Sequence, residues 1–293
     1  MDMTRRGFLK GTAAGVAGAR LGVEMLPAEE AASKKAPQIR LSACDWSLGA
    51  GGPGGLEIAK RCTLEGLEVS AGGAADKLKI ADADYRKQYK EKVKETGILV
   101  PSLAMGLLNG SPLATEPRGP AWLEQTIEAA ADLGAGVILV AFFGKGSLLS
   151  GKDFKKDDVE AVVTRLKDAA VKAKEAKVIL GLENTLSAKQ NLEIIDRVKS
   201  DWVRVYYDIG NSTGGGYNVP EEIRTLKERM AMIHFKDGGS YLGEGKVKME
   251  PVAEALHAIE YKGWIVLETS CPSKDRDADF KKNAAYVRKL MGV

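Results

Sequence analysis

The strongest constraint on the fold is a regular alternation of short apolar runs with longer amphipathic segments, which continues from Ile39 to the C-terminus. A continuous apolar run of four to eight residues is typical of a strand that is buried on both faces of a parallel sheet. Eight such runs occur, and the strands they predict are Ile39–Ala43, Gly66–Val69, Leu99–Leu103, Val137–Ala141, Val178–Leu182, Val203–Tyr207, Met230–Phe235 and Trp264–Glu268. Eight strands separated by helical segments predict an α/β fold of the (β/α)8 TIM barrel type.

The segments between these runs carry the spacing of amphipathic helices. Val159–Ala176 is the clearest, because its apolar residues recur at i, i+3 and i+4 while Lys and Glu occupy the other side. The same pattern occurs in Leu192–Val198, Glu221–Glu228 and Pro251–Ile259. An open, doubly wound sheet is the alternative, but it normally has fewer strands or a Gly-rich phosphate turn. The Gly51–Gly55 cluster lacks the G-x-G-x-x-G spacing of such a turn, so we favour the barrel.

The N-terminal residues resemble a twin-arginine export signal. Residues 4–10 read Thr-Arg-Arg-Gly-Phe-Leu-Lys, a weakly apolar run follows over 11–23, and small residues near Ala28 and Ala32 offer a cleavage site. An ordinary amphipathic helix is the alternative interpretation. The apolar run is too short to span a bilayer, so we expect no stable membrane span in the mature form. We therefore expect residues 1–32 to be the signal peptide, residues 33–293 to be the barrel domain, and the location to be periplasmic or otherwise extracytoplasmic.

Composition excludes several kinds of site. Lys and Arg total 43 against 40 Asp and Glu, which gives a net charge of +3 with no basic tract, so nucleic acid is not an expected partner. The sequence has only two histidines, His234 and His257, which excludes any site built from several histidines. Cys44, Cys62 and Cys271 form neither a CxxC pair nor an even disulfide framework, and we expect them to be free thiols.

Four polar residues stand at the ends of the last four predicted strands. They are Glu183, Asp208, His234 and Glu268, at intervals of 25, 26 and 34 residues. Each interval is close to one βα repeat, so a barrel places all four at its C-terminal rim, on neighbouring strands about 4.8 Å apart. Three carboxylates held together repel one another, and a divalent cation between them removes that cost. Three oxygen ligands and one imidazole suit one divalent metal ion, with Mn²⁺ as the first choice and Mg²⁺, Co²⁺ or Zn²⁺ as alternatives.

The residues around these positions carry a resemblance to a known family. The segments are Glu183-Asn184, Asp208-Ile209-Gly210-Asn211, His234-Phe235-Lys236-Asp237 and Leu267-Glu268-Thr269. In this order and spacing they resemble the xylose isomerase-like TIM barrel superfamily of sugar isomerases and epimerases. The resemblance covers Ile39 to the C-terminus and is strongest over 178–270. It implies that Glu183 and Glu268 bind metal and also transfer protons, and that Asp208 and His234 complete the metal site.

The resemblance implies a divalent-metal sugar isomerase or epimerase that acts through a metal-stabilised enediolate. In such a reaction the ion polarises a carbonyl, Glu183 removes the neighbouring proton and Glu268 returns one. Return to the neighbouring carbon gives an isomer, and return to the opposite face gives an epimer. The alternative function is that of a lyase, in which the same site acts as a metal-dependent dehydratase on a keto-polyol of the inosose type. A third alternative is a non-catalytic sugar-binding barrel. A repair endonuclease is strongly disfavoured, because its multi-metal cluster needs more histidines than this chain has.

The expected substrate is a small sugar. The sequence shows no phosphate cradle and no arginine cluster. We therefore expect a non-phosphorylated ketose or polyol derivative. Assembly of the protein into a homo-oligomer is possible under this hypothesis.

Five further residues are candidates for contact with the substrate: Trp46, Glu68, Asn184, Asn211 and Lys236. Trp46 follows the first strand and is interpreted either as a stacking surface for a sugar or as a core residue. Glu68, near the end of the second strand, is expected to hydrogen-bond the substrate or to form a salt bridge. Asn184 and Lys236 lie beside ligand positions and are expected to contact substrate hydroxyls or to orient the ligands. Many relatives carry His where Asn211 stands, and Asn lacks the titratable group.

Two more residues are expected to have structural roles. Asp237 is expected to anchor its own loop or a neighbouring ligand. His257 falls within the Pro251–Ile259 helical pattern, and we expect it on the outer surface of the barrel.

Overall fold

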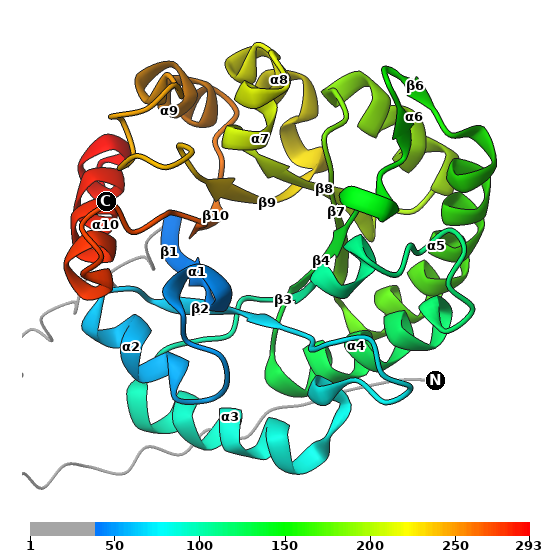
Figure 1. Ribbon diagram of the computed structural model, residues 1–293, viewed down its shortest axis with the longest axis horizontal. Helices are drawn as coiled ribbons and strands as arrows, with labels where there is room; N and C mark the ends of the chain where they lie inside the picture. Colours follow the sequence, from blue (N-terminus) through cyan, green and yellow to red (C-terminus); the bar gives the residue numbers. More distant parts are fainter. Residues whose placement is uncertain (1–38) are drawn as a thin grey trace, which may run out of the picture. The chain divides into compact units, whose positions relative to one another are not determined.

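The computed structural model describes residues 39–293, so the predicted signal peptide and residues 33–38 lie outside the described residues. Eight parallel strands close into a barrel in the order β1-β10-β9-β8-β7-β4-β3-β2 (Figure 1). The strands are β1 (Ile39–Cys44), β2 (Gly66–Ser70), β3 (Ser102–Met105), β4 (Val137–Ala141), β7 (Ile179–Glu183), β8 (Val203–Asp208), β9 (Met230–Phe235) and β10 (Gly263–Leu267). The predicted (β/α)8 TIM barrel is confirmed.

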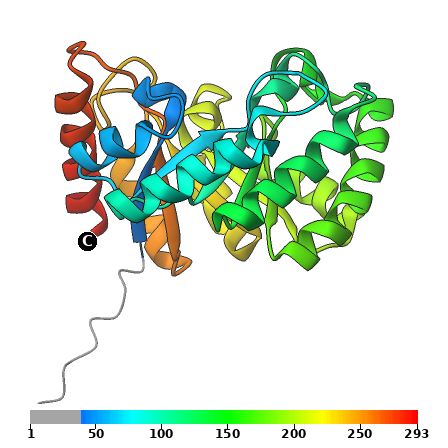
Figure 2. The same ribbon diagram turned by 90° about the horizontal axis from the view of Figure 1, so that it is seen from below.

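One main helix follows each barrel strand and lies on the outside of the barrel (Figures 1 and 2). These helices are α2 (Gly55–Arg61), α3 (Ala83–Thr96), α4 (Gly119–Leu133), α5 (Lys156–Ala176), α6 (Ala188–Val198), α8 (Val219–Leu226), α9 (Met249–Ala258) and α10 (Arg276–Met291). Within the described residues, no helix is both long enough and apolar enough to cross a membrane.

Short elements decorate the loops between these units. They are the helices α1 (Asp45–Leu48) and α7 (Ile209–Gly214), the two-stranded sheet of β5 (Leu149–Ser150) and β6 (Asp153–Phe154), and the 3-10 turns η1 (Lys79–Ala81), η2 (Gly106–Asn109), η3 (Gly144–Gly146) and η4 (Lys227–Arg229). The helix α1 and the turns η2 and η3 follow the C-terminal ends of their strands, which is the end of a TIM barrel where ligands bind.

Every predicted strand overlaps an observed strand, and Val137–Ala141 and Met230–Phe235 agree to the residue. The largest difference is at β3, which begins at Ser102 rather than at the predicted Leu99. Leu99 makes only an isolated bridge with Gly66. Pro101 stands between that bridge and β3, and proline has no N–H to donate to a ladder, which accounts for the late start.

Helix starts follow local capping chemistry. At α6, the side chain of Ser187 accepts a hydrogen bond from the backbone N–H of Gln190, while Gln190 Oε1 accepts one from the Ser187 N–H. This capping box begins the helix at Ala188, four residues before the predicted Leu192. At α8, Pro220 occupies the first turn, where its missing N–H costs no hydrogen bond.

The barrel interior holds a small core of its own, formed by Cys44, Ala104, Val137, Leu139, Ala141, Tyr206, Met232 and Val266. Tyr206 is the largest of these side chains, and two local features of the backbone allow its ring to lie in the interior. The register of β8 against β9 shifts between Val205 and Tyr206. On the other side, a Cβ at Gly181 would lie only 3.1 Å from Tyr206 Cβ, so the glycine leaves room for the ring. Tyr206 therefore fills the barrel just below its C-terminal rim.

Candidate functional site

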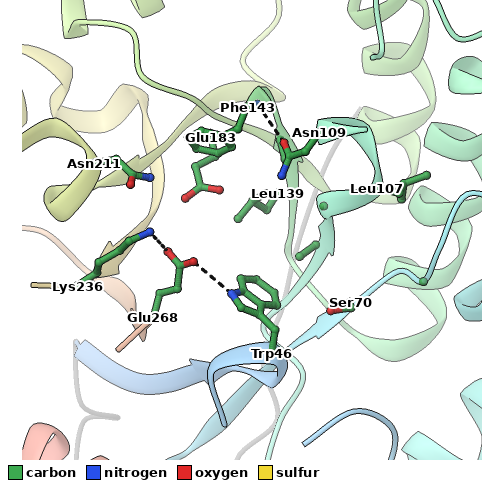
Figure 3. A pocket seen from close by; sticks show the side chains of 14 residues that line it. Trp46, Ser70, Leu107, Asn109, Leu139, Phe143, Glu183, Asn211, Lys236 and Glu268 are labelled. Atoms are coloured by element: carbon green, nitrogen blue, oxygen red, sulfur yellow. Dashed lines mark hydrogen bonds and ion pairs between the residues drawn. The ribbon is translucent and has the colours of Figure 1, made fainter. Parts of the chain in front are cut away.

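A cavity of about 520 Å³ opens at the C-terminal ends of the barrel strands. This is the face where TIM barrels carry their ligand sites. The cavity, shown in Figure 3, is lined by Trp46, Ser70, Gly72, Ala104, Gly106, Leu107, Asn109, Leu139, Ala141, Phe143, Glu183, Asn211, Lys236 and Glu268. The charged residues of the lining, Glu183, Lys236 and Glu268, stand at the end of β7 or directly after β9 and β10. The lining residues in and after β3 and β4 are mostly apolar.

The four residues that the strand-end pattern singles out lie together. They are Glu183, Asp208, His234 and Glu268, and each offers a ligand atom within 4.8 Å of those of the other three. Measured from Nδ1 of His234, the nearest carboxylate oxygens lie at 2.9 Å for Glu183, 3.4 Å for Glu268 and 3.8 Å for Asp208. The barrel register that pairs β7, β8, β9 and β10 side by side produces this cluster.

The chemistry of this cluster fits a divalent cation. Asp208 Oδ2 is buried and has no hydrogen-bond partner among the described residues, although Lys236 Nζ lies 3.4 Å away. A buried carboxylate oxygen without a donor is costly unless a positive charge satisfies it. Three carboxylates and one imidazole form the donor set that ions such as Mn²⁺, Mg²⁺ and Zn²⁺ accept. The residues present therefore suit such an ion.

The two glutamates of the cluster have opposite electrostatic environments. Burial raises the pKa of Glu183 to about 7, and the nearby Asp208 and Glu268 add to this against the opposing effect of His234. Burial would also raise the pKa of Glu268, but hydrogen bonds and charges from His234 and Lys236 hold it well below its usual range. Burial raises the pKa of Asp208 as well. Glu183 is thus the carboxylate of the cluster that is poised to exchange a proton near neutral pH.

The imidazole of His234 is completely buried in the centre of the barrel. Burial disfavours its charged form, yet Tyr206, Cys44 and the carboxylates of Glu183 and Glu68 together raise its pKa well above the ordinary value. Both ring nitrogens lie 2.9 Å from a carboxylate oxygen, Nδ1 from Glu183 and Nε2 from Glu68. The ring is therefore held between the rim cluster and a second carboxylate below it.

Three of the predicted substrate-contact residues line the cavity, namely Trp46, Asn211 and Lys236. Trp46 is 42% exposed, which is not the burial of a core residue, and its Nε1 donates to Glu268 Oε1 at 3.2 Å. Lys236 Nζ donates to the other oxygen of the same carboxylate at 2.8 Å (Figure 3). The backbone N–H of Asn211 donates to Asp208 Oδ1 at 2.7 Å, which caps α7.

The other two predicted contact residues, Glu68 and Asn184, lie outside the cavity, and for Glu68 the structure shows the salt-bridge alternative, with His234 as the partner. Glu68 is the middle residue of β2 and is fully buried inside the barrel, because it stands below the strand end rather than at it. Asn184 turns towards its own loop, where Nδ2 donates to Asn191 Oδ1 at 2.8 Å and Oδ1 accepts from the N–H of Leu186 at 2.9 Å. Neither side chain faces the space that a substrate would fill.

The two residues with expected structural roles behave as expected. Asp237 accepts hydrogen bonds from four backbone N–H groups in the loop that leads to α9, those of Gly243, Gly245, Lys246 and Val247. A Cβ at Gly245 would collide with this carboxylate, so the loop requires glycine there. His257 lies exposed on α9, where its Nε2 contacts the carbonyl of Met291.

Sequence reasoning missed the wall of the cavity formed by residues that follow β2, β3 and β4. Asn109 lies at the end of η2, and its Oδ1 accepts a hydrogen bond from the N–H of Phe143, which joins the two loops. Ser70 donates through its N–H and its Oγ to the buried carboxylate of Asp45. The only sequence feature that could have identified these cavity residues is their position at or shortly after the predicted strands.

Comparisons with known proteins agree with this architecture. Residues 56–290 match the sequence model of the family described as xylose isomerase-like TIM barrel. The chain is 26% identical over 242 residues to a protein named putative L-ribulose-5-phosphate 3-epimerase SgbU of Escherichia coli K12, which covers 74% of this chain and 82% of that protein. It is 25% identical over 257 residues to L-ribulose-5-phosphate 3-epimerase UlaE of Escherichia coli SMS-3-5 / SECEC, with coverages of 80% and 88%.

Solved structures share the fold. An L-ribulose 3-epimerase superposes with a TM-score of 0.70 at 21% identity and covers 87% of this chain and 95% of its own. The apo form of the 3-keto-D-glucoside 4-epimerase YcjR from E. coli superposes with a TM-score of 0.69 at 16% identity, with coverages of 86% and 99%. At these identities, the likeness concerns the fold.

Proposed function

We infer the function of this protein from the premise that its chain belongs to the xylose isomerase-like TIM barrel family. We propose that it is an isomerase, specifically a sugar epimerase that inverts a carbon next to the keto group of a ketose. The observation that carries this proposal is the cluster of Glu183, Asp208, His234 and Glu268 at the barrel cavity. The names of the curated relatives, which are 3-epimerases, favour epimerisation over aldose–ketose isomerisation.

The same four residues would hold one divalent ion, with Mn²⁺ as the first choice. Such an ion, when bound, withdraws electrons from a substrate carbonyl and so acidifies the neighbouring C–H. The carboxylate-rich donor set and the unpartnered Asp208 Oδ2 support this assignment. Which of Mn²⁺, Mg²⁺, Co²⁺ and Zn²⁺ is bound depends on supply as well as on affinity.

Two glutamates on either side of the substrate explain an inversion. Glu183 ends β7 and Glu268 follows β10, so two strands, β8 and β9, separate their positions around the rim. Glu183 removes the proton from one face of the carbon, and an enediolate forms. Glu268 delivers to the opposite face a proton that it takes up from solvent, and Glu183 then releases its proton to solvent, which restores both groups. Trp46 and Lys236 each hold one oxygen of Glu268, so its carboxylate keeps a defined direction during the reaction.

The cavity favours a sugar without a phosphate group. Among the residues that line it, Lys236 is the only cation, and its ammonium already lies 2.8 Å from Glu268 and 3.4 Å from Asp208. A phosphate would need free cations or an N–H cradle. We therefore propose a non-phosphorylated ketose, although the curated relatives carry names of phosphorylated substrates. The exposed ring of Trp46 offers an apolar surface for one face of the sugar.

The location follows as a proposal from residues 1–32, which resemble a twin-arginine signal. We propose export to the periplasm or a similar compartment, where free sugars are the available substrates. Fusion of residues 1–40 to a reporter that is active only after export tests this. Export that is lost in the Arg5→Lys, Arg6→Lys double variant supports the proposal, and a reporter retained in the cytoplasm in both forms contradicts it.

The activity is tested by proton exchange. The Mn²⁺-loaded protein is incubated in D₂O with a panel of ketopentoses, ketohexoses and keto-glycosides, together with the 5-phosphate of each ketopentose. We expect deuterium at the inverted carbon and an epimer as product, visible by NMR, with the free sugars turned over faster than the phosphates. No exchange with any member of the panel contradicts the proposal, and an enone product identifies the dehydratase alternative instead.

Matched variants test the roles of the two glutamates. Glu183→Gln and Glu268→Gln keep the shape of each side chain but remove its proton-transfer group. We expect each to lower kcat by at least about 100-fold. The exposed pair of Lys282 and Glu244 provides a control, because Glu244→Gln changes a surface carboxylate outside the cavity and is expected to leave turnover unchanged.

A further inference from the structure

A second polar layer lies in the barrel interior directly below the rim cluster. Its centre is the carboxylate of Glu68, which is completely buried. Oε1 of Glu68 lies 2.9 Å from Nε2 of His234. Oε2 accepts hydrogen bonds from Ser102 Oγ at 2.6 Å and from Tyr206 Oη at 2.7 Å. The thiol of Cys44 completes the layer at 3.5 Å from Oε1.

This arrangement dictates where the ring proton of His234 resides. Both oxygens of Glu68 act as acceptors, and the hydroxyls on Oε2 are donors, so Nε2 of His234 must donate as well. A buried carboxylate is tolerated only with such donors. In the neutral ring that metal ligation requires, a proton on Nε2 leaves Nδ1 without one, and Nδ1 faces the rim cluster, 2.9 Å from Glu183. A histidine can ligate a metal only through the nitrogen that carries no proton.

We propose that Glu68 is a positioning residue that acts through His234: it keeps the ring proton on Nε2 and directs Nδ1 at the metal-binding cluster. Ser102, on β3, and Tyr206, on β8, hold Glu68 in place, so strands from three parts of the barrel fix one imidazole. The inference rests on the proposed function, since the direction of Nδ1 matters only if the cluster holds a cation. It replaces the substrate contact that the sequence suggested for Glu68.

Cys44, Glu68 and His234 also meet the spacing of a metal site, with ligand atoms within 4.8 Å of one another. All three are fully buried, and the oxygens of Glu68 already accept from four donors. No position is left for the water or substrate ligand that a catalytic ion keeps. A hydrogen-bond network therefore accounts for this group, and it predicts one bound ion per chain rather than two.

The test uses the metal alone, without any sugar. Mn²⁺ and Zn²⁺ affinities of the full chain are measured by competition with a chromophoric chelator, and the bound metal is counted by elemental analysis. Glu68→Gln keeps the side-chain shape but removes the charge from the acceptor. We expect a 10- to 100-fold weaker affinity, the usual effect of losing such a partner, and one ion per wild-type chain.

A second readout follows the ring proton itself. The chain has only two histidines, so ¹⁵N-histidine labelling gives two ring systems, and His257 serves as the internal reference. In the Zn²⁺-loaded wild type, we expect the proton of His234 on Nε2, protected from exchange. In Glu68→Gln, we expect faster exchange of that proton or a mixture of the two tautomers.

A control variant separates positioning from stability. Thr126 lies buried within α4, where its Oγ1 donates to the carbonyl of Trp122. Thr126→Val therefore loses a buried hydrogen bond outside the site, and we expect a lower Tm with unchanged metal affinity. The inference is overturned if Glu68→Gln binds metal as tightly as the wild type with the same tautomer, or if its loss of affinity only matches that of Thr126→Val. In the same preparation, sugar turnover by the wild type reports separately on the proposed function.

Discussion

Lys236 Nζ lies 2.8 Å from Oε2 of Glu268, and the same nitrogen lies 3.4 Å from Oδ2 of Asp208. One ammonium thus lies close to two of the three carboxylates in the rim cluster and offsets part of their negative charge. The pair is partly enclosed, so its charges are less screened than those of a surface salt bridge. This relationship ties the stability of the metal-free protein to the same carboxylates that would bind a cation.

The first prediction concerns that ammonium. Lys236→Met removes one positive charge beside the cluster, so we expect the metal-free protein to lose about 1–3 kcal/mol and to bind Mn²⁺ roughly tenfold more tightly. Urea unfolding and chelator competition measure the two effects. Lys282→Met, which breaks an exposed pair with Glu244, is the control and is expected to change neither quantity appreciably. Weaker metal binding in Lys236→Met would contradict the electrostatic account.

A second prediction concerns stabilisation by metal. At about 100 times its Kd, a bound ion adds about 2.7 kcal/mol to the free energy of unfolding, which raises the Tm of a domain of this size by roughly 5–10 °C. Asp208→Asn keeps the oxygen that accepts from Asn211 but removes the charge, so we expect the Tm rise to disappear. Thermal melts with Mn²⁺ and with EDTA measure this. An equal Tm rise in the variant would place the ion elsewhere.

A third prediction concerns pH. Because the pKa of Glu183 is raised to about 7 in the metal-free protein, above its ordinary value, its contribution to folding stability is lost as pH rises through 7. Metal binding needs the deprotonated carboxylate, so the titration of Glu183 makes metal affinity rise as the pH rises from 6 to 8. Calorimetry in buffers of different ionisation enthalpy is expected to show about one more proton released at pH 6 than at pH 8, because Glu183 is protonated only at the lower pH. Glu183→Gln is expected to abolish this difference between the two pH values, and a difference that persists in the variant would contradict the assignment.

A fourth prediction concerns the loop before α9. Asp237 accepts four backbone N–H groups, so Asp237→Ala leaves several donors without a partner. We expect a loss of roughly 3 kcal/mol or more in the free energy of unfolding, measured with urea. Asp237→Asn keeps one acceptor oxygen and is expected to lose less. A change below about 0.5 kcal/mol in Asp237→Ala would show that the loop is held by other contacts.

The strands were readable from the sequence because their burial on both faces produces uninterrupted apolar runs. Val137–Ala141 is such a run, and all five of its residues are buried. Helices with thin apolar stripes were harder to recognise. In α3, only Tyr89 and Thr96 among 14 residues are buried, so its charged sequence carries little periodic signal. The start of β3 depended on Pro101, a local effect that the apolar pattern does not reveal.

The site likewise has one part that the sequence predicts and one part that it does not. The intervals between Glu183, Asp208, His234 and Glu268 follow the βα repeat, so a single sequence suffices to bring them to one rim. For a residue that lies in a strand below the rim, the direction of the side chain depends on strand tilt and register. A single sequence does not show either of these. Glu68 therefore looked like a rim residue, although it points into the barrel below His234.

The central claim is that one divalent ion is bound by Glu183, Asp208, His234 and Glu268. Anomalous diffraction from crystals grown with Mn²⁺ tests it most directly. We expect a single strong anomalous peak per chain, located between the four side chains and next to Nδ1 of His234. No peak at this position under saturating Mn²⁺, or a peak held by other residues, would contradict the account.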